Sequence, residues 1–234
     1  MLNKETEYTY VTSKDADVEN GNFGKNVGVD IVTEKMSIRH GGLDEGGISS
    51  VLDDLIEGKS GIHLVSNAES VGDAAFACLK QEGINVGLGW YLESVDFPKA
   101  TSIGSGAFAS CSALTSVDLP KATSIGEGAF ASCSALTSVD LPNATSIGNG
   151  AFNSCSALTS VDLPNATSIG NGAFASCSAL TSVDLPKATS IGEGAFGGIS
   201  STAVINLGAA EGEISGAPWG APEGVTINYG VKEA

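Results

Sequence analysis

The residues best placed to do chemistry are five aspartates that recur every 22 residues. Each follows a Ser-Val pair and precedes an apolar residue and a proline, so polar and apolar positions alternate. This alternation predicts a half-buried strand with the carboxylates on its solvent face. Stacked copies would form an acidic strip suited to a cationic or hydroxyl-rich ligand, or to weak Ca²⁺ binding. The column consists of Asp96, Asp118, Asp140, Asp162 and Asp184.

Stacked strands would hold these carboxylates about 4.8 Å apart. Like charges at that distance favour the protonated form, so we expect some of the aspartates to titrate above their usual pKa. The alternative is that the aspartates have no function. They would then be solvated side chains whose repulsion is reduced by nearby serines and lysines, and repeat duplication would have placed them in one column. Both interpretations stay open at the level of sequence.

Other positions of the repeat vary between copies within an otherwise constant text. Polar variation of this kind indicates exposed positions that a ligand can read, although simple drift explains it equally well. One such column joins the aspartates as candidate binding residues: Lys99, Lys121, Asn143, Asn165 and Lys187. A second column is Ser105, Glu127, Asn149, Asn171 and Glu193.

Known catalytic and metal-binding motifs are absent from the sequence. The two histidines, His40 and His63, form no H-E-x-x-H pair, and no G-x-S-x-G elbow occurs. The cysteines lack the close pairs of a structural zinc site. Neighbouring copies would point their thiols the same way, so we expect all five cysteines to stay free as small buried hydrophobes. We predict neither catalysis nor a cofactor or metal; the alternative of another class is an enzyme carried by the non-repeating N-terminal segment.

The 22-residue period also dictates the architecture. The phenylalanines that follow each Gly-x-Gly-Ala turn, from Phe108 to Phe196, keep the same step as the prolines. A strict period of this length predicts a solenoid in which each unit contacts only its neighbours. Upstream, the repeat text returns with ten extra residues between Cys78 and Leu92, and downstream Ile205 and Ile227 continue the apolar column.

The repeated text A-F-x-S-C-S-A-L-T-S-V-D-L-P followed by A-T-S-I-G resembles the BspA-like leucine-rich repeat. That family occurs in bacterial surface proteins and in phage or prophage structural proteins, and the resemblance implies binding or adhesion without catalysis. Two flanks are similar to the phage and prophage members. They are the lead-in at residues 55–76 and the Gly-Pro-Trp ending at residues 210–230.

The expected fold is therefore mainly β: a leucine-rich-repeat solenoid of 22-residue units with parallel strands, a short helical N-cap and a C-cap containing Trp219. The first 47 residues contain short extended pieces at 8–12 and 29–38, which would form an arm, a docking segment or a small β-unit. We divide the chain into an N-terminal arm or docking segment at 1–47, the helical cap at 48–61, the solenoid at 62–207 and the C-terminal cap with a final strand at 208–234.

The net charge of −16 disfavours nucleic acid as a partner, and no apolar run is long enough to span a membrane. The start lacks a signal peptide, so we expect synthesis in the cytoplasm and a final place in a virion or at a cell surface. We predict a non-enzymatic recognition or adhesion module, a phage tail, baseplate or head-decoration protein. It would bind a protein or glycan on a cell surface and dock to virion proteins through residues 1–47. The alternative within the binding class is a bacterial cell-surface adhesin of the BspA-like type.

Overall fold

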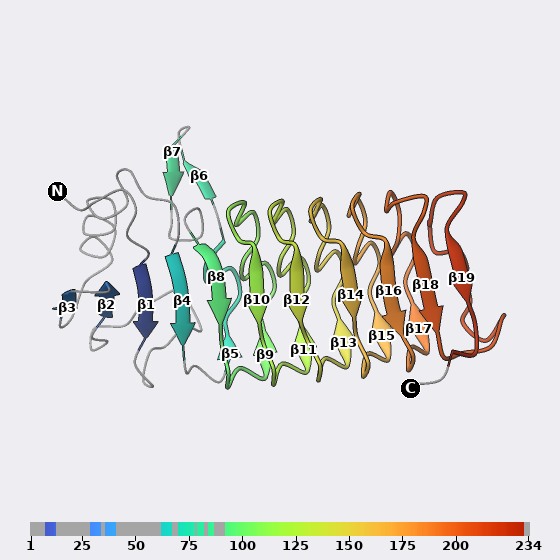
Figure 1. Cartoon of the computed structure of the whole chain (residues 1–234), viewed down its shortest axis with the longest axis horizontal. Coiled ribbons are helices and arrows are strands. Elements are labelled where there is room, and N and C mark those ends of the chain that lie inside the picture. The colour runs from blue at the N-terminus through green and yellow to red at the C-terminus, as the bar shows by residue number, and fades with distance from the viewer. Residues whose placement is uncertain are drawn as a thin grey trace.

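The computed structural model describes residues 70–77 and 92–231 in full, together with the strands at 8–12, 29–33, 36–40, 62–66, 79–81 and 84–86. In these ranges the chain consists of strands and turns without a helix. The strands stack into the expected solenoid of parallel β-strands, with its long axis horizontal in Figure 1. The predicted helical cap at 48–61 lies outside the described residues.

Each turn of the solenoid contributes one strand to a face of longer strands, and all but the last two turns also contribute one to a face of two-residue strands. The longer strands are β4 (Ile62–Ser66), β8 (Leu92–Asp96), β10 (Ser116–Asp118), β12 (Ser138–Asp140), β14 (Ser160–Asp162), β16 (Ser182–Leu185), β18 (Val204–Leu207) and β19 (Thr226–Asn228). The short ones are β5 (Ser70–Val71), β9 (Ser102–Ile103), β11 (Ser124–Ile125), β13 (Ser146–Ile147), β15 (Ser168–Ile169) and β17 (Ser190–Ile191).

The register confirms the period, because each residue pairs with its own copy one turn on. Val117 lies opposite Val139 in β10 and β12, and Ile125 lies opposite Ile147 in β11 and β13. The sheet of short strands is continuous from β5 to β17. The other face is formed by two ladders, one ending at β12 and the next beginning at β14.

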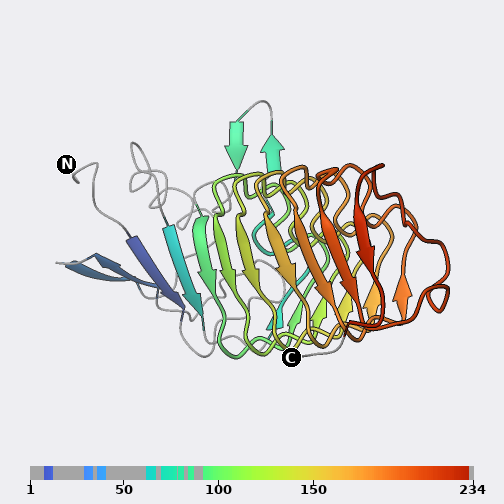
Figure 2. The same ribbon diagram turned by 45° about the vertical axis from the view of Figure 1, so that its right-hand side comes forward.

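The N-terminal strands extend the same face. Strand β1 (Tyr8–Thr12) pairs in parallel with β4, while β2 (Val29–Thr33) and β3 (Met36–His40) add antiparallel strands beyond it. The extended piece expected at 8–12 is thus a strand, and the piece expected at 29–38 falls on two strands, β2 and β3. The ten extra residues contain the hairpin β6 (Leu79–Gln81) and β7 (Ile84–Val86), which projects away from the solenoid (Figure 2).

A column of stacked phenyl rings forms the centre of the core. Successive rings from Phe76 to Phe174 lie 5.2–5.4 Å apart between centroids and within 9° of parallel. The last step, from Phe174 to Phe196, is 6.0 Å. Trp219 then packs edge-on against Phe196 at 6.4 Å and 76°, and it is 2% exposed. The indole therefore covers the open end of the stack, as the sequence predicted.

Two backbone positions show how closely successive turns approach. A Cβ on Gly126 would lie 2.6 Å from the backbone of Gly104, so this glycine serves close packing between turns. Gly128, by contrast, has a φ of +58° and serves the turn itself. The serine before each repeat cysteine also has a positive φ, as at Ser132 with 62°, and Gly198 occupies the same position in the last copy.

We expect Phe152→Ala to lower the free energy of unfolding by about 3–5 kcal/mol, because it opens a cavity inside the ring column. Urea unfolding followed by circular dichroism measures the loss. Ser124→Ala, on the exposed face of β11, is the matched control and should change stability by less than about 0.5 kcal/mol. A loss below about 1 kcal/mol for Phe152→Ala would contradict a core built on this column.

Candidate binding surface

The aspartate column lies on the solvent side of the longer strands, as predicted. Asp118 lies opposite Asp96 on one side and Asp140 on the other, and Asp162 lies opposite Asp184. The carboxylates of β10, β12 and β14 are exposed, whereas those at the two ends of the column are half-buried. The neighbouring valines and leucines of the same strands point into the core, which fixes the direction of the carboxylates.

Two of the aspartates carry the raised pKa that the sequence predicted. Partial burial raises the pKa of the Asp118 carboxyl, and the charges of Asp96 and Asp140 raise it further. Burial likewise raises the pKa of Asp162, with Asp184 and Asp140 adding to the effect. The sequence argument named only like-charge repulsion, but desolvation is the larger cause in both cases.

At its C-terminal end the acidic column becomes an amide ladder. Asn206 donates from Nδ2 to Asp184 Oδ1 at 2.6 Å, and Asn228 donates from Nδ2 to Asn206 Oδ1 at 2.8 Å. Ser182 also donates to the second Asp184 oxygen at 3.4 Å. The last carboxylate is therefore engaged within the solenoid, unlike the exposed carboxylates of β10, β12 and β14.

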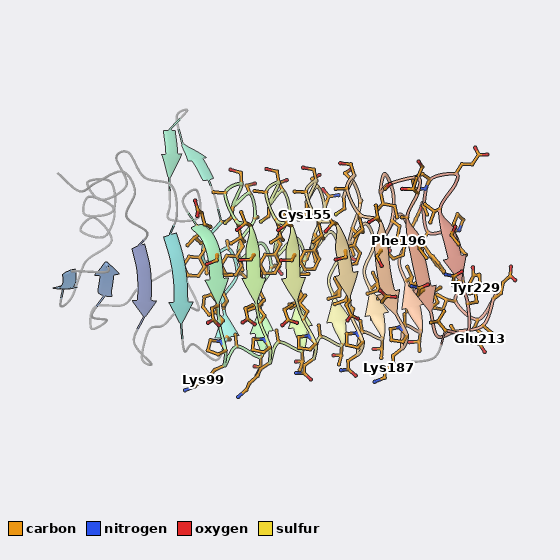
Figure 3. All side chains as sticks on the ribbon, in the orientation of Figure 1. Lys99, Cys155, Lys187, Phe196, Glu213 and Tyr229 are labelled. Atoms are coloured by element: carbon orange, nitrogen blue, oxygen red, sulfur yellow. The ribbon has the colours of Figure 1, made fainter. Side chains whose placement is uncertain are left out.

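The Lys/Asn column lies at the turn that follows these strands, and Figure 3 shows Lys99 and Lys187 pointing outward from that edge. Its asparagines have a structural use that the sequence did not indicate. Asn143 and Asn165 each donate to the proline carbonyl of the preceding turn, at 2.6 and 2.8 Å. Lys187 donates to Asn165 Oδ1 at 2.8 Å. The column thus links neighbouring turns while presenting lysine at both ends.

The second variable column also bridges turns. Asn149 Oδ1 accepts from the Asn171 N–H, and Asn171 Oδ1 accepts from the Glu193 N–H, both at 2.9 Å. Asp73 does the same for Ser105 at 2.7 Å. Sequence reasoning missed this role, although the side chains found here, Asn and Asp, are those that commonly bond to nearby backbone.

The cysteine column is internal. In the described residues Cys111, Cys133, Cys155 and Cys177 are free and buried, as expected, while Cys78 lies outside them. The Cys155 thiol donates to Phe130 O at 3.1 Å, and Cys133 and Cys177 make the equivalent bond. Burial raises the pKa of the Cys177 thiol to about 12. These thiols are therefore core residues and no part of a binding surface.

The fully described part of the surface exposes little large apolar side chain. Among the fully described residues, Val231 alone is a large hydrophobic residue with an exposed side chain, and its exposed fraction is 38%. Those residues contain no group of three or more His, Cys, Asp and Glu arranged to hold a metal ion. No helix in the described parts of the chain is long and apolar enough to cross a membrane.

The repeat geometry and the surface together define a class of protein: a parallel β-solenoid built from leucine-rich-repeat sequence motifs. The family model for the BspA type leucine rich repeat region matches six copies over residues 89–209. The chain belongs to the BspA-type leucine-rich-repeat family.

Two solved structures are similar to this chain in part. One is a leucine-rich-repeat protein of T. pallidum, at 27% identity and a TM-score of 0.47; the match covers 58% of this chain and 72% of that one. Another is a leucine-rich cell surface protein of Faecalibacterium prausnitzii, at 29% identity and a TM-score of 0.47, covering 65% of this chain and 42% of that one. No curated protein matches the chain.

Removing the central charge tests the electrostatics of the column. Since the folded-state pKa values of Asp118 and Asp162 are raised, ionising these groups costs stability, and the cost appears as the pH rises through those values. Asp140→Asn should lower both pKa values and raise the melting temperature at about pH 7, with no gain below about pH 3. Carboxylate NMR titration and thermal unfolding at the two pH values measure these effects.

The matched control is Asp73→Asn, which removes one carboxylate away from the column and keeps an amide oxygen for Ser105. Its effect on the pKa values of Asp118 and Asp162 should be negligible. If Asp140→Asn leaves both of those pKa values unchanged, the aspartates do not interact as a column.

Proposed function

We propose that this protein is a non-enzymatic recognition or adhesion module that binds a protein or glycan at a cell surface. The observation that carries the proposal is the repeated polar face, on which the exposed Asp118, Asp140 and Asp162 recur on successive turns. The side chains on the opposite side of the same strands are buried in the core, so only the solvent face is available to a partner. Regular, exposed rows of this kind are the surfaces that solenoid proteins offer to partners.

The chemistry of this face supports a polar mode of binding. Contacts to the described face would be made by carboxylates, hydroxyls and the lysines at its edge, because large apolar side chains there are buried. Binding through such groups falls as salt concentration rises. Affinity would come from the repetition of weak contacts along the solenoid rather than from one deep site.

The triple variant Asp118→Asn, Asp140→Asn, Asp162→Asn tests the face directly. The fluorescently labelled full chain is incubated with intact bacterial cells, and bound protein is measured by flow cytometry. We expect binding to fall by at least about fivefold, as for the loss of several contacts of about 0.3–0.5 kcal/mol each. The control replaces Ser124, Ser146 and Ser168 with alanine on the other sheet and should leave binding within about twofold. Equal binding by both triple variants would contradict the proposal that the aspartate face is the binding surface.

We further propose that the module is part of a phage particle, as a tail, baseplate or head-decoration protein, with residues 1–47 docking to other virion proteins. The support is the resemblance of residues 55–76 and 210–230 to phage and prophage members of the family. Placement at a virion or cell surface rests on the same proposal. The alternative is a BspA-like adhesin on a bacterial surface, which the repeat family itself accommodates.

Deleting residues 1–47 tests the docking proposal. We expect the truncated chain to be lost from purified particles, because the segment that anchors it is gone. Circular dichroism of the purified truncated chain verifies that the solenoid is folded without β1, which pairs with β4. A folded truncated chain that co-purifies with particles at the level of the full chain would refute docking through this segment.

A further inference from the structure

The C-terminal end of the solenoid carries an open sheet edge. Strand β19 pairs with β18 on one side and is the outermost strand of its sheet (Figure 1). The Thr226 N–H donates to Ala203 O at 2.9 Å, toward β18. Since backbone groups alternate sides along a strand, the N–H and C=O of Ile227 face away from the solenoid. An edge of this kind is a template for an added strand.

The side chains of the last turn match this open edge. Inward residues of the preceding turn, Ile205 and Leu207, are fully buried. Their counterparts Ile227 and Tyr229 are half-buried against the same core, and Val231 is exposed. Figure 3 shows Tyr229 at this end of the molecule. The apolar layer is therefore unfinished on its outer side, while Trp219 closes the phenyl column farther inside.

The amide ladder is open at the same place. Asn228 uses its Nδ2 to reach Asn206, in the same direction as the bond from Asn206 to Asp184. Within the described residues no donor reaches Asn228 Oδ1. A further strand with a donor side chain at the next position would continue the ladder.

The net charge of the C-terminal end determines which kind of added strand it favours. Residues 199–234 contain Glu211, Glu213, Glu223 and Glu233 against a single lysine, Lys232. Two copies of this end would bring like charges together, which disfavours a tail-to-tail pair of this chain. A basic segment would meet a complementary field.

We propose that the outer edge of β19 binds an extended, lysine- or arginine-rich segment of another protein as an added parallel or antiparallel strand. Backbone bonds to Ile227 supply the pairing, alternate apolar side chains of the segment complete the layer over Ile227 and Tyr229, and its basic residues lie near Glu213 and Glu223. This site is separate from the aspartate face, so neither proposal depends on the other.

The test uses the full chain and a synthetic eight-residue peptide in which valine alternates with lysine and asparagine. We expect saturable binding with a dissociation constant below about 1 mM by NMR titration. The Ile227 amide should be among the shifted signals and should gain protection from hydrogen exchange. Matched peptides with glutamate for lysine, or with proline at the centre, should bind at least about tenfold more weakly.

Two pairs of variants locate the site. Ile227→Pro removes the outward donor while leaving the Thr226 bond to β18, and it should weaken binding at least about tenfold, whereas Ile227→Val should not. Glu223→Gln should weaken binding about two- to fivefold, and the control Glu127→Gln in the solenoid should leave it unchanged.

Several results would overturn the proposal. They are the absence of binding at about 1 mM peptide, binding that Ile227→Pro leaves intact, and an Ile227 amide that gains no protection. The last readout uses the unmodified chain, so the proposal can fail even when the proline variant does not fold. Self-association of the chain that Ile227→Pro abolishes would also overturn it, because the occupant would then be a second copy.

Discussion

Every part of this structure depends on one constraint: the backbone meets its own copy 22 residues later. The Gly126 N–H donates to Ile103 O and the Gly148 N–H to Ile125 O, both at 2.8 Å, and bonds of this kind recur turn after turn. Since successive turns are nearly identical in sequence, any side chain stacks on its own kind. The arrangement therefore favours residues that pack or bond well with their own kind.

Each repeated column meets this requirement in its own way. Phenyl rings stack in parallel, and the Thr145 hydroxyl donates to the carbonyl of its own counterpart, Thr123, at 3.0 Å. Asparagine reaches the next turn through its amide, and the glycine at Gly126 lets backbones approach. Aspartate is the exception, because stacked carboxylates repel and pass no hydrogen bond along the column. A column that costs stability and faces solvent is the best candidate for a partner-binding surface, which is why the proposed function rests on it.

The period, the strand that carries the aspartates and the buried cysteines were readable from the sequence, because a strict repeat forces identical residues into one register. Trp219 was also predictable, since an open stack of rings requires a cover. The inter-turn bonds of Asn143 and Asn165 were not, because the same residues read equally well as exposed ligand contacts. The positive φ of Ser132 was hidden too, as only its replacement by Gly198 in the last copy hints at it. The open edge at β19 required the strand pairing itself.

The C-terminal end of the solenoid is closed in its core and open at its sheet edge. Trp219 covers the last phenyl ring, whereas Asn228 leaves the amide ladder open. Under both proposals, the acidic charge near that edge and the acidic column on the face would favour partners of opposite charge.

The most direct test of the 22-residue register is the excision of one complete turn. A chain lacking residues 123–144 should fold into a solenoid that is one turn shorter, with the same β-type circular dichroism and cooperative urea unfolding, because turn-on-turn contacts re-form across the junction. A chain lacking only residues 123–142 breaks the register and should be far less stable. Equal stability of the two chains, or failure of the first to fold, would contradict the account.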